Sequence, residues 1–511
     1  MPSTSRRSLV ALAVSFYLLI VAAVFATIWH QTAGHFTYTL DDTYIHMALA
    51  VQLSHGHYGI NPGEPSSPSS SLLWPFLLVP FANKTFHLYL TLALNLLSNI
   101  ASAILIGIAV SEWPSPKQSD DDRWFRRVSV MGLVLAGNLV GTTFLGMEHG
   151  LQVLAAIACA TGICRVLSGR PLPPWSIVAA AVAPMLRYED LALTAAIAIT
   201  LYGLNRRRAS ALLVLVSILP LAAFSVFLHS RGLPLLPLSV LVKGSAAGAH
   251  NNFAFTAVHT LGAGIYHALV EPTRWPILAL FAMLAGAARK SPDPSRRFAL
   301  AGAAIATGLH LLIGRFGWLH RYEVYALAFA AVIVLRLMQE YPLPRLGWYV
   351  LGFVALVTPY AEAIPESALS AEDVYGQQYQ LHRFANDYYW GNVGVLDLGK
   401  ISYHLAPGRY VLDLGGLASV EAARQTVKSD AWVKDVVQRH DVGLVFGFVP
   451  SPMPTGWTYL GDICLVRTPI YMAPCVHFLS TKAGEGAEMK RRFASFASTL
   501  PKQTTAVFPQ P

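Results

Sequence analysis

Two adjacent acids, Asp41 and Asp42, are the residues of this sequence best placed to do chemistry. They follow residues 8–29, a stretch that has no charged residue and is long enough to cross a bilayer, since about 20 apolar residues suffice. Arg6 and Arg7 precede this stretch, and because Lys and Arg favour the cytoplasmic side, the two acids are expected at the outer face. Two carboxylates there can act as a base, as metal ligands, or as both. The position favours a membrane enzyme.

A helix cap is the simpler explanation for one of the two aspartates. Residues 42–53 carry apolar side chains at helical spacing, with Tyr44 on the apolar face, and an aspartate at the start of such a segment can cap it. A cap does not account for two acids in a row at the edge of a bilayer, where unpaired charge is costly. Glu64 follows in the sequence Asn-Pro-Gly-Glu, which is typical of a turn.

The composition is that of a protein with many membrane spans. Of the 511 residues, 54% are hydrophobic and only 13% are charged. Clusters of Lys and Arg recur between apolar stretches, and placing them all on the cytoplasmic side gives about eleven crossings within residues 1–361. A cleaved signal peptide does not fit, because apolar spans continue after the first. The net charge of +9 lies mainly in these clusters, so no nucleic-acid partner is expected. Cys159 and Cys164 lie in an apolar stretch and are expected to be small buried hydrophobes.

The remaining polar residues gather in the connections on the outer side. Guanidinium and ammonium groups from three different connections can converge on a phosphate, which arginine binds in bidentate fashion and lysine as a point charge. These connections hold the further candidates Glu148, Arg187, Glu189, Lys243, His320 and Arg321.

Each of these candidates has a simpler explanation. Arg187 can serve only as an ion-pair partner of Glu189 or Asp190 near the membrane surface. Lys243 can extend its ammonium group to the headgroups of membrane lipid. Glu148 can be a structural partner of an arginine across the helix bundle.

The chain changes character after a last span at residues 346–360. Residues 362–498 are polar enough for a small soluble α/β domain, and the tail 499–511, rich in Pro, Gln and Thr, is expected to be disordered. Cys464 and Cys475 lie in this domain, where a disulfide and two free thiols are both open. The expected elements are strands at 392–397, 409–413 and 443–449, and a helix at 420–437 that Ser419 caps.

Several segments occur in an order typical of one enzyme family. They are Asp41-Asp42 with Tyr44-Ile45, residues 59–64 and Leu73-Trp74, then Gly146-Met147-Glu148, Arg187-Tyr188-Glu189, Gly232-Leu233-Pro234 through Lys243, His320-Arg321-Tyr322, Asp397-Leu398-Gly399 and residues 413–417. This order resembles the GT-C glycosyltransferases, polytopic enzymes that use polyprenyl-phosphate sugars. The best-matching subgroup is the bacterial set related to the terminal arabinofuranosyltransferases of mycobacterial cell walls. The chain departs from that subgroup at Tyr188, where a proline is common, and in its Ser-rich run 66–71.

The resemblance implies a fold and an activity. The fold is a polytopic α-helical membrane protein of the GT-C type, with a small C-terminal α/β domain in the periplasm and the N-terminus in the cytoplasm of a bacterium. The activity is inverting transfer of a sugar from a polyprenyl-phosphate donor, at the inner membrane, to a hydroxyl of a glycan, glycolipid or protein. Asp41 is the implied base, and Asp42 orients the acceptor or shares a metal. The implied ligands of the donor phosphate are Lys243, Arg187 and Arg321, and the further site candidates are Tyr44, Glu64, Glu148, Glu189 and His320.

No cofactor is required for the transfer, although a divalent metal can bind at Asp41 and Asp42.

Two other functions compete with this one. A transporter or flippase of lipid-linked sugars is the alternative, but its charges should lie near the middle of spans or at breaks in helices, whereas the polar groups here lie at span ends. The third hypothesis is a receptor or assembly protein that acts through the C-terminal domain and does not need Asp41.

Overall fold

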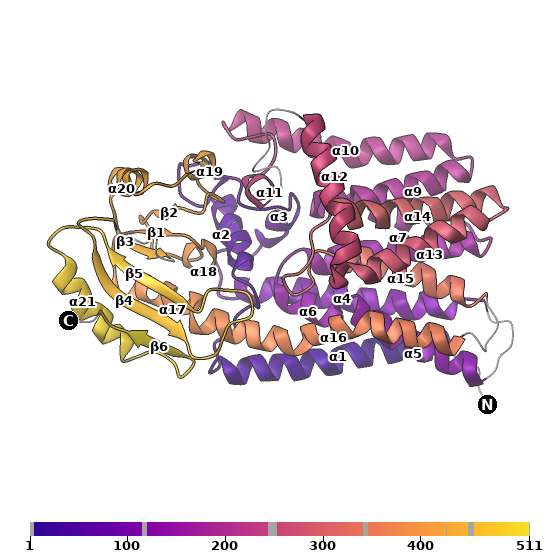
Figure 1. The fold of residues 1–511 in the computed structure, drawn as a ribbon, viewed down its shortest axis with the longest axis horizontal. Coiled ribbons are helices and arrows are strands. Elements are labelled where there is room, and N and C mark those ends of the chain that lie inside the picture. Colours follow the sequence, from indigo (N-terminus) through magenta and orange to yellow (C-terminus); the bar gives the residue numbers. More distant parts are fainter. Residues whose placement is uncertain are drawn as a thin grey trace.

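The structure is a computed structural model that describes residues 5–114, 120–243, 253–340, 346–425, 427–447 and 454–509. A bundle of helices and a domain built on a β-sheet follow one another along the long axis, with the N-terminus at the end of the bundle away from the sheet (Figure 1). The bundle helices are α1 (Arg6–Gln31), α4 (His87–Ser111), α5 (Asp120–Ala136), α6 (Leu139–Leu145), α7 (His149–Leu167), α8 (Pro174–Leu186), α9 (Leu191–Gly203), α10 (Arg207–Ser230), α12 (Phe253–Val270), α13 (Trp275–Lys290), α14 (Pro294–Ile313), α15 (Val324–Met338) and α16 (Leu346–Gly376).

The apolar helices make this a multi-pass membrane protein. Within the described residues, six are long and apolar enough to cross a bilayer: α1, α4, the continuous stretch Asp122–Leu145, α7, α10 and α14. A seventh is reached if α12 and α13, which are bent by 93° at a short break, count as one span. The predicted number of about eleven is not reached. One reason is length, because the 13 residues of α8 rise only about 20 Å, less than the hydrocarbon core of about 30 Å.

Helix α15 forms the centre of the bundle. Every residue from Val324 to Met338 is buried, as expected for a helix that is apolar on all sides. In contrast, α1 buries only one stripe, at residues three or four apart such as Leu9, Ala13 and Tyr17, and leaves its other face to lipid. The bundle therefore has a protein-covered centre and an apolar outer surface.

The C-terminal domain is a mixed six-stranded sheet with the order β2-β1-β3-β5-β4-β6. Strands β2, β1 and β3 are parallel, and the other pairs are antiparallel. The three predicted strands and the α/β character of the domain are confirmed. The strands are β1 (Asn392–Val395), β2 (Val411–Asp413), β3 (Val442–Gly447), β4 (Thr458–Leu465), β5 (Cys475–Ser480) and β6 (Thr504–Val507).

Two details of this domain differ from the sequence prediction. The single helix expected at 420–437 is two helices, α19 (Val420–Arg424) and α20 (Asp430–Arg439), because Ser429 supplies a second N-terminal cap after the predicted one at Ser419. The tail expected to be disordered contains β6. Its Thr and Val side chains suit a strand, and β4 offers an edge with which it pairs.

The structure decides the state of all four cysteines. Cys464 and Cys475 face each other on β4 and β5 and form a disulfide. Cys159 and Cys164 are free and buried within α7.

Candidate functional site

A cavity of about 660 Å³ lies between the bundle and the sheet domain. Asp41 and Asp42 line it from the segment that enters α2 (Asp42–Ser54), and Arg321 lines it from the connection between α14 and α15. Asp397 and Tyr471 line it from the sheet domain. The cavity therefore needs both parts of the chain, and it contains both acids that the sequence analysis put first.

Asp41 stands at the start of α2, but its side chain makes no capping hydrogen bond there. Its Oδ1 instead accepts a 2.6 Å hydrogen bond from the backbone N–H of Lys400, in the short helix α18 (Gly399–Ser402) of the sheet domain. Gly399 lies directly against the carboxylate, since a Cβ at this position would be 1.6 Å from Asp41 Oδ2. The capping explanation is thus wrong for Asp41, whose partner is 359 residues away.

The surroundings of Asp41 alter its acidity. Burial raises the pKa of Asp41 well above its ordinary value, and the nearby carboxylates of Asp397 and Asp42 raise it further, while the Lys400 N–H and ammonium group act against them. Burial also lowers the pKa of Lys400 to about 8. The Lys400 ammonium lies 4.5 Å from the ring centroid of Tyr44 and is held there by a cation–π contact. A carboxylate with a raised pKa holds a proton more tightly than an ordinary one, so its ionised form is suited to accept a proton during a reaction.

Asp42 forms an ion pair with Arg321. The Arg321 Nη2 lies 2.8 Å from Asp42 Oδ2, and the same nitrogen lies 2.8 Å from the Tyr322 hydroxyl. The Tyr322 ring has three guanidinium groups around it, at 4.8 Å for Arg321, 5.4 Å for Arg187 and 5.5 Å for Arg315. The structure therefore brings together two of the three predicted phosphate ligands, Arg187 and Arg321, and adds Arg315.

The three arginines differ in how far their charge is neutralised. Arg187 bonds to Glu148 at 2.9 Å and also pairs with Glu189, so it has the ion-pair partner that the simpler explanation required. Glu148 is fully buried and pairs with this arginine across the bundle, as its own simpler explanation stated. Arg315 is exposed and lines the cavity, and no carboxylate within the described residues pairs with it. The cavity thus has a guanidinium group that is available to an anion.

The other candidates have structural partners. Glu64 accepts a 2.6 Å hydrogen bond from the Tyr410 hydroxyl and so ties the first loop to the sheet domain. His320 lies 2.8 Å from Glu323. The Tyr44 hydroxyl accepts from the backbone N–H of Tyr38. Lys243 ends α11 (Leu238–Lys243), but its side chain lies outside the described residues.

Sequence reasoning did not single out Asp397, Gly399 and Lys400 as site residues. The signal was available in part, because Asp397 follows β1 closely and the carboxyl ends of parallel strands are a common place for binding sites. Asp413, at the end of the neighbouring strand, serves a different purpose. Its carboxylate accepts hydrogen bonds from the N–H groups of Gly415 and Ala418 and so shapes the following turn.

The structure adds no support for a metal ion at Asp41 and Asp42. Within the part of the chain that the structure describes, no group of three or more His, Cys, Asp and Glu side chains is arranged to hold a metal ion. A divalent metal at Asp41 and Asp42 stays a prediction from the sequence.

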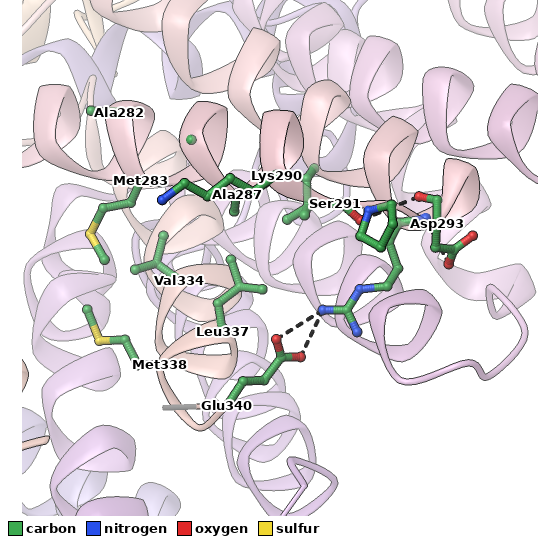
Figure 2. A pocket seen from close by; sticks show the side chains of 14 residues that line it. Ala282, Met283, Ala287, Lys290, Ser291, Asp293, Val334, Leu337, Met338 and Glu340 are labelled. Carbon is green, nitrogen blue, oxygen red and sulfur yellow. Dashed lines mark hydrogen bonds and ion pairs between the residues drawn. The ribbon is translucent and has the colours of Figure 1, made fainter. Parts of the chain in front are cut away.

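Two more cavities lie in the bundle. An apolar groove of about 460 Å³ runs between α4, α7 and α8 and is lined by residues such as Leu105, Leu151 and Leu186, the last of which directly precedes Arg187. Another cavity, of about 620 Å³, lies between the end of α13, the start of α14 and the end of α15, and Figure 2 shows the side chains that line it. Glu340 on its wall pairs with Arg296 and with Arg336, so the charge there is largely matched.

One segment of the chain has a known relative. Residues 369–482 match a family described as a domain of unknown function (DUF8728). The match begins near the end of α16, reaches just past β5, and includes the Asp397–Lys400 segment and Tyr471. No curated protein matches the chain. The region that matches DUF8728 thus supplies one wall of the cavity, and Lys400 in this region donates the hydrogen bond that holds Asp41 in place.

Proposed function

We propose that this protein is an inverting glycosyltransferase that moves a sugar from a polyprenyl-phosphate donor to a hydroxyl of a glycan, glycolipid or protein. The observation that carries the proposal is the cavity itself. A buried carboxylate with a raised pKa, Asp41, and the guanidinium groups of Arg315 and Arg321 line the same space at one end of a membrane bundle. The proposed location is a bacterial inner membrane with the sheet domain in the periplasm.

The chemistry uses these groups at its two ends. The acceptor oxygen attacks the anomeric carbon and gives its proton to the Asp41 carboxylate as the new carbon–oxygen bond forms. The bond from the anomeric carbon to the phosphate oxygen breaks, and its electron pair leaves with the lipid phosphate. Arg315 and Arg321 stabilise the charge that develops on that phosphate. Direct displacement with a single carboxylate base inverts the anomeric centre.

The apolar groove suits the lipid part of such a donor. Its wall of leucine, alanine and tryptophan side chains faces the outside of the bundle, where a polyprenyl chain can enter from the membrane. Leu186 lines the groove, and the next residue is Arg187, whose guanidinium group lies 5.4 Å from the ring centroid of Tyr322, a residue that lines the cavity. A lipid chain in the groove would therefore place its phosphate near the three arginines.

The test is transfer of radiolabelled sugar from polyprenyl-phosphate donors in membranes that contain the protein. We expect Asp41→Asn to abolish transfer, because asparagine keeps the size and the hydrogen-bond acceptor for Lys400 but cannot take a proton. Asp293→Asn is the matched control. Asp293 caps α14 at the far end of the bundle, where asparagine caps equally well, so full activity is expected. Transfer by the Asp41→Asn protein at the wild-type rate would refute Asp41 as the base.

A transporter of lipid-linked sugars is the second candidate, and one observation favours it. Helices α12 and α13 are bent by 93° at a break, and broken helices are typical of transporters. The same membranes decide between the two functions. If no donor yields product but a fluorescent lipid-linked sugar crosses the bilayer faster than in control vesicles, the transporter replaces the enzyme.

A further inference from the structure

The turn that precedes Tyr322 has an unusual backbone. Trp318, Leu319 and His320 have φ angles of 53°, 60° and 55°, so three consecutive residues with side chains lie in the left-handed region. Each such residue costs of order 1 kcal/mol or more and persists only where its surroundings hold it, commonly at functional sites. We therefore ask which contacts hold this backbone conformation and what the conformation achieves.

The surroundings hold the turn from both sides. The Glu323 carboxylate accepts hydrogen bonds from the Gly317 N–H at 3.0 Å and from His320 Nδ1 at 2.8 Å. On the other side, the Asn138 amide donates to the Leu319 carbonyl at 2.9 Å. Leu319 is fully buried, whereas its neighbour Trp318 lines the cavity and is 47% exposed. The result of the turn is to direct a tryptophan ring into the cavity.

The Trp318 ring stacks on a second aromatic ring from the other part of the chain. The centroids of Trp318 and Tyr471 are 5.7 Å apart, with 27° between the ring planes. Tyr471 lies in the connection between β4 and β5, whose ends the Cys464–Cys475 disulfide joins. The Tyr471 hydroxyl donates to Glu366 at 3.1 Å, which fixes the ring. Both rings are therefore held in place before any ligand binds.

The chemistry of the cavity then limits what these rings can bind. Its acids and arginines suit hydroxyl and phosphate groups, while the paired rings offer a flat apolar surface in the same space. A sugar ring combines these features, since it has an apolar C–H face and hydroxyl groups at its edge. A lipid chain does not need the polar groups, and the apolar groove already provides for it.

We propose that the Trp318–Tyr471 pair binds a sugar ring of the acceptor, so that the acceptor is a carbohydrate and its hydroxyl reaches Asp41. This inference rests on the proposed function and narrows its three classes of acceptor to glycans and glycolipids. The pair sets the position of the acceptor and takes no part in the proton transfer.

The experiment measures binding and transfer separately, with purified full-length protein in nanodiscs. Binding of arabino-, galacto-, manno- and glucotetraose is followed by saturation-transfer NMR in the Asp41→Asn background. We expect at least one of these probes to bind, Trp318→Ala to weaken that binding at least 10-fold, and Trp318→Phe to weaken it less. Tyr471→Phe should weaken it less than Trp318→Ala, because it keeps the ring but loses the hydrogen bond to Glu366. Trp390→Ala is the matched control, since Trp390 is exposed on the sheet domain and does not line the cavity.

Transfer assays then separate this inference from the proposed function. In the Asp41-containing protein, Trp318→Ala should raise the acceptor KM at least 10-fold and leave the donor KM unchanged. If the wild type is active and Trp318→Ala leaves the acceptor KM unchanged, the Trp318–Tyr471 pair does not bind the acceptor, but the proposed glycosyltransferase function still holds. The same conclusion follows if the wild type prefers peptide acceptors to carbohydrate acceptors. If no donor gives product, the proposed function fails, and the binding measurement alone decides whether Trp318 contacts a sugar.

Discussion

Replacing Gly399 with alanine tests the contact that joins the two parts of the site. A Cβ at this position would lie 1.6 Å from Oδ2 and 1.8 Å from Cγ of Asp41, whereas ordinary contacts begin at about 3.5 Å. Gly399 does not have a positive φ, so its backbone accepts alanine and the added methyl group is the only perturbation. The carboxylate or the whole of α18 must move.

The size of the effect follows from that displacement. Asp41 must retreat by about 2 Å to restore an ordinary contact, and it then loses its hydrogen bond from the Lys400 N–H. A hydrogen bond to a charged group contributes about 1.5 to 3 kcal/mol. Because misplacing a reacting group by about 1 Å costs roughly 100-fold in rate, we expect transfer to slow at least about 100-fold. This corresponds to about 2.7 kcal/mol of activation free energy.

The assay is sugar transfer by the purified protein, measured together with its melting temperature. Gly286→Ala is the matched control, because Gly286 lies in α13 with nothing within 4 Å of the added Cβ, and alanine favours a helix. It should keep full activity. If Gly399→Ala transferred sugar at the wild-type rate with an unchanged melting temperature, the contact between Asp41 and Gly399 would not be part of the working enzyme.

Two further predictions follow from the site. A base must be ionised to accept a proton, so the rate of transfer should fall as the pH drops through the pKa of Asp41. The Asp397 carboxylate raises this pKa, so Asp397→Asn should move the acidic limb of the pH–rate profile to lower pH. The Lys400 ammonium group lowers the pKa of Asp41, so Lys400→Met should move the acidic limb to higher pH. If both variants moved the limb in the same direction, Asp41 would not be the base whose ionisation the profile reports. Replacing Cys464 and Cys475 with serine opens a loop of 11 residues and should cost about 2 to 3 kcal/mol, seen as a lower melting temperature. It should also raise the acceptor KM, because the connection between them carries part of the cavity wall.

The sequence predicted those parts of the site that depend on local pattern. Asp41 and Asp42 stood out because acids next to a membrane span are costly, and both line the cavity. Arg187 stood out as a guanidinium group that could bind phosphate, yet the charge pattern alone did not decide between a phosphate ligand and an ion pair with a nearby acid such as Glu189. Lys400 was missed because its role depends on a contact across 359 residues. No local pattern contains such a contact.

The limits on the fold have a similar cause. Strands β1 to β3 were predicted because they are buried runs of apolar residues, whereas β6 is a strand only because β4 leaves an edge for it. About eleven spans were expected, and six or seven are shown within the described residues, because basic clusters mark the sides of a membrane but do not measure the length of each helix. Short apolar helices such as α8 separate the same clusters without meeting the length of a span.

The contacts between the two parts also bear on the hypothesis that the C-terminal domain acts by itself. The side-chain amide of Asn61, in the loop after α2, exchanges two 3.0 Å hydrogen bonds with the backbone of Val411 and so ties this loop to strand β2 at the edge of the sheet. Lys400 holds Asp41, and Tyr410 holds Glu64. A receptor domain tethered to an anchor needs none of these bonds. The proposed site, with Asp41 as its base, needs the bond to Lys400, because separating the parts would leave Asp41 without this partner and the cavity without its wall.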